Sequence, residues 1–291
     1  MKIIKYFFEF LSVLSLFSIF KIIGLKNASN LGSFLGQSVG PLFRSKDIIV
    51  QNIKIALGNI NEDQQKKIIK GMWSNIGRTF AEYVFLKEFK FNRTNFEHMK
   101  IIGSEHLQEI KKSNKPVIFF SGHLGNFELM AMELDKSGIK TAAIYRPLNN
   151  IFLNPIMEYL RMKYICANQI PKGRSGTREV INRFKNGYSI ALMVDQRVGE
   201  GLKVNFFNRP AQTTTIPAQL ALRYGCKLVP ISLKRVENIF FEMTVHQPYN
   251  ISSTGNEDKD IQNITLKINQ SIEKMIVKNS NQWLWSHNRW K

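Results

Sequence analysis

The stretch Pro116-Val-Ile-Phe-Phe-Ser-Gly-His-Leu-Gly-Asn-Phe-Glu128 decides the fold class. Its first five residues are apolar and are typical of a short buried strand. A turn that carries His123 between two glycines follows, and the pattern then predicts a helix over Glu128 to Asp135. A buried strand, a turn and a helix in this order form the first half of a βα crossover.

The same alternation continues to the end of the chain. Further strands are predicted at residues 141–145, 189–194, 228–233 and 239–245, and helices at 155–163, 177–185, 217–223 and 261–276. Strands that alternate with helices favour a parallel sheet. We therefore predict an α/β catalytic domain over residues 99–291, with a mainly parallel sheet flanked by helices.

The first 23 residues are strongly apolar, but Lys5, Glu9 and Lys21 interrupt them. The uncharged run at residues 10–20 is shorter than the ~20 residues that a spanning helix needs. This pattern favours a helix that lies in the membrane interface. A cleaved signal peptide is the alternative, although no small-x-small cleavage site follows the run.

Residues 1–45 are predicted to be membrane-associating helices, and the helical pattern of residues 46–98 predicts a segment that packs on the core. Ala28, Gly32, Gly36 and Gly40 recur at intervals of four, which aligns small residues on one face of a helix. This stripe fits either close packing within the protein or contact with a membrane helix.

The chain has 291 residues and a formal net charge of +19, with 44% hydrophobic residues. This composition excludes a wholly disordered chain and indicates acidic partners. Cys166 and Cys226 suggest neither a disulfide framework nor a zinc site. A nucleic-acid-binding protein would explain the charge, but no RNP, KH, helix-turn-helix or finger pattern is present and the basic residues are scattered.

His123 and Glu128 are candidates for acid–base chemistry. If His123 lies on the turn and Glu128 on the first turn of the helix, the two side chains can meet. A carboxylate on one imidazole nitrogen leaves the other free to act as a general base. The alternative is an ordinary turn histidine and a first-turn acid. Arg146, Asp195 and Gln196 follow other strand ends, where ligands bind in such folds.

The chain resembles the glycerolipid and lipid A acyltransferase superfamily through this His-x-x-x-x-Glu pattern, and specifically the bacterial lipid A biosynthesis acyltransferases of the lauroyl and myristoyl type. Supporting strings occur in the family's order along the whole chain: Asn75-Ile-Gly-Arg78-Thr-Phe-Ala-Glu82, Tyr145-Arg-Pro147, Val194-Asp-Gln196, Thr213-Thr-Thr-Ile-Pro-Ala218 and Trp283-Leu-Trp-Ser-His-Asn-Arg-Trp290. The implied fold is that of the glycerolipid acyltransferases.

This resemblance implies transfer of a fatty acyl chain from acyl-acyl carrier protein to a hydroxyl of a phosphorylated, Kdo-bearing lipid A precursor, without a metal or cofactor. His123 would be the general base and Glu128 its orienting partner. Arg146 and Gln196 would stabilise the oxyanion or bind the acceptor phosphate, and Asp195 would orient Arg146 or an acceptor hydroxyl. The implied location is the bacterial inner membrane, with the catalytic domain on the cytoplasmic side.

Three arginines are less firmly tied to the motif. Arg289 is a candidate for substrate binding, although the closing string has one arginine where the family has two. Arg174 and Arg178 form either a basic docking face for the carrier protein or a solvated helix face. Two functions compete with this one. The protein could be another glycolipid or lysophospholipid acyltransferase of the same superfamily, or a non-catalytic membrane scaffold.

Overall fold

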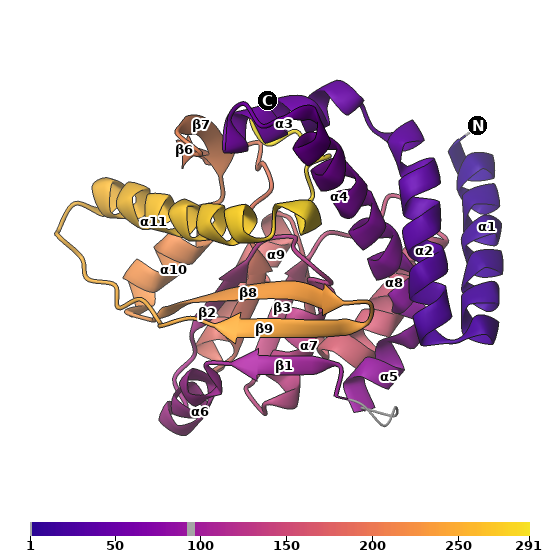
Figure 1. Cartoon of the computed structure of the whole chain (residues 1–291). Helices are drawn as coiled ribbons and strands as arrows, with labels where there is room; N and C mark the ends of the chain where they lie inside the picture. The colour runs from indigo at the N-terminus through magenta and orange to yellow at the C-terminus, as the bar shows by residue number, and fades with distance from the viewer. Residues whose placement is uncertain (1, 92–96) are drawn as a thin grey trace.

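The computed structural model describes residues 2–91 and 97–291, and its centre is a seven-stranded sheet (Figure 1). The strand order is β1-β9-β8-β2-β5-β3-β4. The strands are β1 (Met99–Ile102), β2 (Ile118–Ser121), β3 (Thr141–Tyr145), β4 (Asn168–Pro171), β5 (Ser189–Met193), β8 (Leu228–Glu237) and β9 (Phe240–Val245). All neighbouring strands are parallel except β8 and β9. The predicted fold class is confirmed.

Helices pack against both faces of this sheet. They are α6 (Ser104–Ser113), α7 (Glu128–Lys136), α8 (Leu153–Leu160), α9 (Arg174–Lys185), α10 (Ile216–Tyr224) and α11 (Glu257–Lys278), and a π-helical turn, η3 (Arg161–Ile165), continues α8. Successive side chains of a strand point to opposite faces. Phe119 of β2 accordingly joins one apolar core, and Ile118 and Phe120 join the other.

Several elements carry no clear signal in the sequence. These are β1, α6, β4 and a separate antiparallel hairpin of β6 (Leu202–Phe206) and β7 (Arg209–Thr213). The strands β1 and β4 are only four residues long and partly exposed. They therefore lack the continuous apolar run that marks β2.

The N-terminal third of the chain is helical. It contains α1 (Lys2–Ile23), α2 (Leu25–Val39), η1 (Gly40–Phe43), α3 (Lys46–Leu57), α4 (Glu62–Glu82), η2 (Tyr83–Phe85) and α5 (Leu86–Phe91). A capping box starts α4, because Asn61 and Gln64 each bond to the other's backbone N–H. Phe20, Ala28 and Ala81 from these helices join the same core as Phe119 of the sheet.

The stripe of small residues on α2 packs against α4. A Cβ atom on Gly32 would lie 2.4 Å from the carbonyl oxygen of Gly77, and one on Gly36 would lie 2.2 Å from that of Trp73. Only glycine allows two helix backbones to approach this closely. Of the two interpretations of the stripe, packing within the protein is therefore the one that the structure supports.

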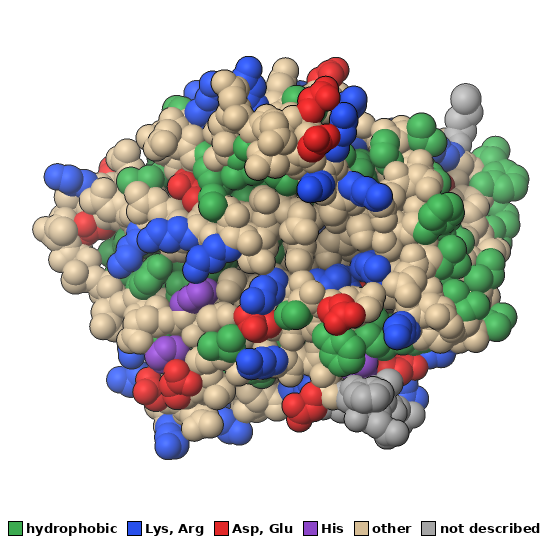
Figure 2. Space-filling view, in the orientation of Figure 1, with side chains coloured by type: hydrophobic (Ala, Val, Ile, Leu, Met, Phe, Trp, Pro, Cys, Tyr) green, Lys and Arg blue, Asp and Glu red, His purple; other side chains and the backbone are tan. Residues whose placement is uncertain are grey.

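Helix α1 lies at the outer edge of the molecule (Figure 1). Its inner side packs Phe17 and Phe20 on Phe80 of α4, with ring centroids 5.2 and 6.3 Å apart. Its outer side exposes apolar residues, which include Ile3, Phe8 and Ile22, and apolar side chains line this edge in Figure 2. Within the described residues, α1 is long and apolar enough to cross a membrane. The helix could therefore associate with a membrane.

Candidate active site

His123 lies on the turn between β2 and α7, and its glycines permit close packing there. A Cβ atom on Gly122 would lie 3.3 Å from the carboxylate of Asp195. Gly125 has a φ of +55°, which favours glycine, and a Cβ atom there would lie 3.2 Å from the backbone nitrogen of Arg235. The glycines thus allow β5 and β8 to support the turn from two sides.

Asp195 follows β5, the strand that pairs with β2 in parallel. Its Oδ1 lies 2.7 Å from Nδ1 of His123, and its Oδ2 accepts a hydrogen bond of 2.8 Å from the His123 backbone N–H. The indole N–H of Trp283 donates a third hydrogen bond, of 2.7 Å, to Oδ2. Three donors therefore fix the carboxylate, and the carboxylate in turn holds the imidazole through Nδ1.

Charge and hydrogen bonding keep Asp195 ionised. Burial alone would raise the pKa of this carboxyl, but the neighbouring imidazole and the hydrogen bonds from His123 and Trp283 lower that pKa to about 2. An ionised carboxylate accepts the Nδ1–H of the ring and leaves Nε2 with its lone pair. The His123 side chain is 17% exposed and is therefore not sealed from solvent.

Glu128 has different partners from the one predicted. Its carboxylate accepts hydrogen bonds from the Tyr83 hydroxyl and from Nη2 of Arg161, the latter at 2.5 Å. Next to the imidazole, at 4.6 Å between ring centroids, lies the ring of Phe127. The structure therefore corrects the prediction that Glu128 bonds to His123. The carboxylate that bonds to the imidazole is that of Asp195, whose predicted role was to orient Arg146 or an acceptor hydroxyl.

Arg161, Glu128 and Tyr83 form a second buried polar group beside the turn. Burial lowers the pKa of Arg161, but the charge of Glu128 and the Tyr83 hydroxyl outweigh it, so the net pKa is raised. The pKa of Tyr83 is raised as well, first by burial and then by Glu128. Nη1 of Arg161 is buried with no partner among the described residues. The sequence did not point to Arg161, because it lies in a π-helical turn without a motif.

Of the other predicted site residues, Gln196 lies close to His123, whereas Arg146 and Arg178 are exposed. The amide nitrogen of Gln196 lies 3.4 Å from Nε2 of His123. Arg146 is exposed and near Lys172, whose pKa is lowered by burial and by the charge of Arg146. Arg178 is exposed on α9, whereas the Arg174 side chain lies outside the part that the structure describes.

Arg289 is fully buried, and the two terminal nitrogens of its guanidinium are engaged. It donates hydrogen bonds of 2.7 Å to the Gln212 carbonyl and to the Thr213 hydroxyl, and it lies 4.8 Å from the centroid of the Phe206 ring. Burial lowers the pKa of this guanidinium to about 10. These contacts hold the β6–β7 hairpin, so the structure gives Arg289 a packing role and no open side toward a substrate.

Two cavities among the described residues do not contain this chemistry. One of about 710 Å³ lies between α9 and α10, and one of about 570 Å³ lies between α11 and the β8–β9 hairpin. Neither is lined by His123 or Asp195. Among residues 2–91 and 97–291, no group of three or more His, Cys, Asp and Glu side chains could hold a metal ion. The candidate site is therefore defined by the His123–Asp195 pair.

The chain matches one family of known proteins over its full length. The family model for the bacterial lipid A biosynthesis acyltransferases matches residues 1–291. The chain belongs to this family. The predicted resemblance is confirmed, and as a lipid A biosynthesis acyltransferase family member the protein is an acyltransferase.

Individual relatives are distant but match over most of both chains. A lipid A biosynthesis lauroyltransferase of Escherichia coli (strain K12) is 22% identical over 253 residues, which are 85% of this chain and 79% of the relative. A lipid A biosynthesis palmitoleoyltransferase of the same strain is 22% identical over 270 residues, 90% of this chain and 84% of the relative. A lipid A biosynthesis acyltransferase of Haemophilus influenzae is also 22% identical, with 88% and 83% covered. Membership thus indicates lipid A acylation, while the relatives' names differ in the acyl group.

Proposed function

We propose that this acyltransferase moves a fatty acyl chain from acyl-acyl carrier protein to a hydroxyl of a Kdo-bearing lipid A precursor, with His123 as the general base. The observation that carries this proposal is the 2.7 Å contact between Nδ1 of His123 and the buried carboxylate of Asp195. A buried, ionised acceptor on Nδ1 selects the tautomer whose Nε2 can remove a proton.

The reaction would follow from this arrangement. Nε2 of His123 takes the proton of the acceptor hydroxyl, and the oxygen attacks the thioester carbon of the donor. A C–O bond forms and the C–S bond breaks, and the imidazolium returns its proton to the departing thiolate. Asp195 stabilises the transient imidazolium, which is the role that we had assigned to Glu128.

Two further groups suit the charge that develops in the transition state. The Gln196 amide lies beside Nε2, where the reacting atoms would meet, and can donate to the oxyanion. Arg161 keeps its charge next to the turn, held by Glu128. We propose that Glu128 contributes to acyl transfer indirectly, by holding the charged guanidinium of Arg161 beside the turn. The exposed Arg146 and nearby Lys172 suit the phosphates of the acceptor.

The membrane side of the proposal depends on α1. Its exposed apolar edge suits an interfacial helix at the inner membrane, and the catalytic domain would then face the cytoplasm, where acyl carrier protein is found. The basic residues on the face shown in Figure 2 are dispersed among acidic ones. We therefore propose Arg178, with Arg174, as part of a docking face for the acidic carrier through local charge and not through the net charge alone.

The test is an acyl-transfer assay with a panel of acyl-carrier thioesters and lipid A precursors. His123→Ala should lower kcat by about 10² to 10⁴, the usual contribution of a general base. His246→Ala is a matched control, because that imidazole is also half-buried but hydrogen-bonds to the Ser232 hydroxyl at 3.0 Å, away from the turn. Near-normal turnover by folded His123→Ala would exclude the mechanism. Transfer to a lysophospholipid alone would exclude the proposed acceptor.

A further inference from the structure

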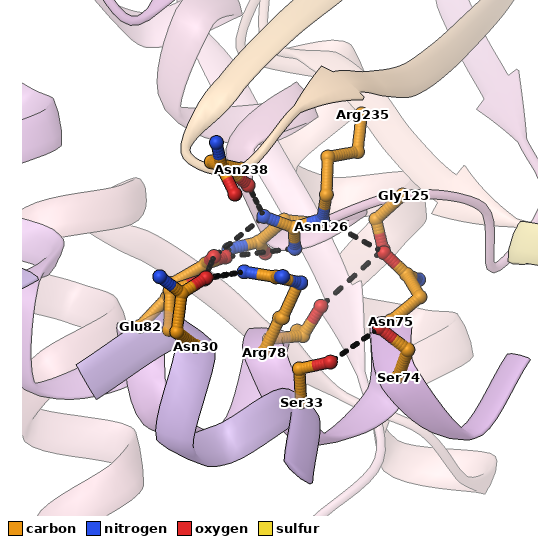
Figure 3. Close-up of polar contacts among 12 residues, drawn as sticks. Asn30, Ser33, Ser74, Asn75, Arg78, Glu82, Gly125, Asn126, Arg235 and Asn238 are labelled. Carbon is orange, nitrogen blue, oxygen red and sulfur yellow. Dashed lines mark hydrogen bonds and ion pairs between the residues drawn. The ribbon is translucent and has the colours of Figure 1, made fainter. Parts of the chain in front are cut away.

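Glu82, the last residue of α4, and Arg235 of β8 form an ion pair inside the protein (Figure 3). Nη1 and Nη2 of Arg235 lie 2.5 and 3.0 Å from the two carboxylate oxygens. Glu82 is fully buried and Arg235 is 9% exposed. Taking two charges out of water is costly, and an apolar pair of similar volume often gives equal or greater stability. Stability is therefore a weak explanation for this pair.

The pair is hydrogen-bonded to Ser29 of α2 and to the Asn238 carbonyl, and one further branch leads to the turn that carries His123. The Asn126 amide donates a hydrogen bond of 2.9 Å to Glu82. Nε of Arg235 donates to Oδ1 of Asn75 at 3.1 Å, and the Asn75 amide donates to the Gly125 carbonyl at 2.8 Å. Figure 3 shows Asn75, Asn126 and Gly125 gathered around the two charged groups. The network therefore ends on the second and third residues after His123.

A second branch leads to the support of Asp195. The Gln282 side chain accepts from the backbone N–H of Arg235 and donates to its carbonyl, both at 2.8 Å. Gln282 precedes Trp283, whose indole N–H bonds to Asp195. The same arginine thus lies between the turn of His123 and the residue that holds its carboxylate partner.

We infer that Glu82, Arg235, Asn75 and Asn126 are positioning residues for acyl transfer, which fix the turn so that the His123 ring meets Asp195. This inference rests on the proposed role of His123. A general base must be held within about 0.5 Å of its productive place. A turn with a glycine at φ +55° does not fix itself, whereas three side-chain hydrogen bonds at residues 125 and 126 from α4 do.

The test replaces the ion pair by apolar side chains in the double variant Glu82→Leu/Arg235→Met. Its packing is preserved, but its links to the turn are lost. We expect kcat to fall by about 10², the effect of a misplacement of about 1 Å, while KM changes by less than about threefold. In ¹⁵N-histidine NMR spectra, the Nδ1–H resonance of His123 should lose the downfield position that a hydrogen bond to Asp195 produces.

The matched control is Glu133→Leu/Lys136→Met. Glu133 is 6% exposed, and its carboxylate lies 2.8 Å from Lys136 within α7, without a bond to the turn. This control should keep both kcat and the His123 resonance. If the Glu82/Arg235 variant is folded and also keeps both, the network only supports the fold and the inference is wrong.

Single variants cover the case in which the double variant does not fold. Asn126→Ala and Asn75→Ala each remove one link and leave the ion pair in place. Each should lower kcat by about tenfold, as the loss of roughly one hydrogen bond does, and should shift the His123 resonance. Unchanged values in both would also overturn the inference. His123→Ala, assayed with these variants, tests the base itself. Full activity of His123→Ala would reject the proposed function. The NMR spectra of the Asn75 and Asn126 variants would still decide whether the network positions the His123 ring.

Discussion

Asp195→Asn is the change that tests the site most directly. The carboxylate accepts three hydrogen bonds: two at Oδ2, from the His123 backbone and Trp283, and one at Oδ1, from the His123 ring. An asparagine has one acceptor oxygen. Placing this oxygen at the Oδ2 position keeps two hydrogen bonds, each of about 1 kcal/mol, so this orientation is preferred.

In that orientation the asparagine NH₂ faces Nδ1 of His123. The ring must then present its lone pair at Nδ1 and carry its proton on Nε2, where it cannot accept a proton from a hydroxyl. The loss of the base contributes a factor of 10² to 10⁴, and we expect kcat to fall by about 10³, or about 4 kcal/mol of transition-state stabilisation. KM should change little, because Asp195 is buried and does not reach the solvent side of the ring.

The assay is steady-state transfer from an acyl-carrier thioester, together with the thermal midpoint of each variant. Asp260→Asn is the matched control, since Asp260 is also hydrogen-bonded, by Ser253 and Thr254, but lies at the start of α11. It should retain full kcat. A folded Asp195→Asn enzyme whose kcat is within tenfold of the wild type would refute the assignment of Asp195 as the orienting group.

Glu128→Ala and Arg161→Ala should each lower kcat by about 10². The double variant should lose no more than either single variant, because the two side chains act together as an ion pair. Additive losses would contradict this coupling. The pKa of His287 is lowered to about 4, mainly by burial, so between pH 4 and about 6.5 the unfolded chain binds a proton that the folded chain does not. The free energy of unfolding should therefore fall as pH drops from about 6.5 toward 4. His287→Gln should flatten this part of a profile of thermal midpoint against pH. Gly77→Ala should lower the free energy of unfolding by about 1–3 kcal/mol and the thermal midpoint with it, because the new Cβ atom would lie 2.0 Å from the Gly32 carbonyl oxygen. Gly199→Ala is the control and should leave the midpoint unchanged, because no atom lies within 4 Å of its Cβ position.

The sequence predicted the sheet where strands are buried on both faces. Residues 141–145 were predicted as a strand and form β3, and the run after Pro116 forms β2, whose four residues are all buried. Such runs are apolar without interruption, so they stand out. The hairpin β6–β7 and the edge strand β4 do not, because exposed or half-buried polar residues interrupt their few apolar positions.

Only the local part of the candidate site can be predicted from the sequence, and the reason is physical. His123 follows a strand end and is framed by glycines, which are local features that a sequence displays. Its partner is not local: Asp195 is 72 residues away and becomes a neighbour only because β5 pairs with β2. A contact with Glu128 is expected from the sequence if His123 lies on the turn and Glu128 on the first turn of the helix. α7 does start at Glu128, but the carboxylate is bonded to Tyr83 and Arg161.

The closing string of the chain is explained by this long-range geometry. Trp283 holds Asp195, and the Asn52 side chain of α3 donates to the carbonyls of Trp285 and His287 at 2.7 and 2.8 Å. These contacts tie the C-terminal segment to α3, as its path in Figure 1 shows. Since Trp283 and Trp285 are almost fully buried, a substrate cannot stack on them. The string therefore fixes the carboxylate that fixes His123, and in this way it would support the proposed base indirectly.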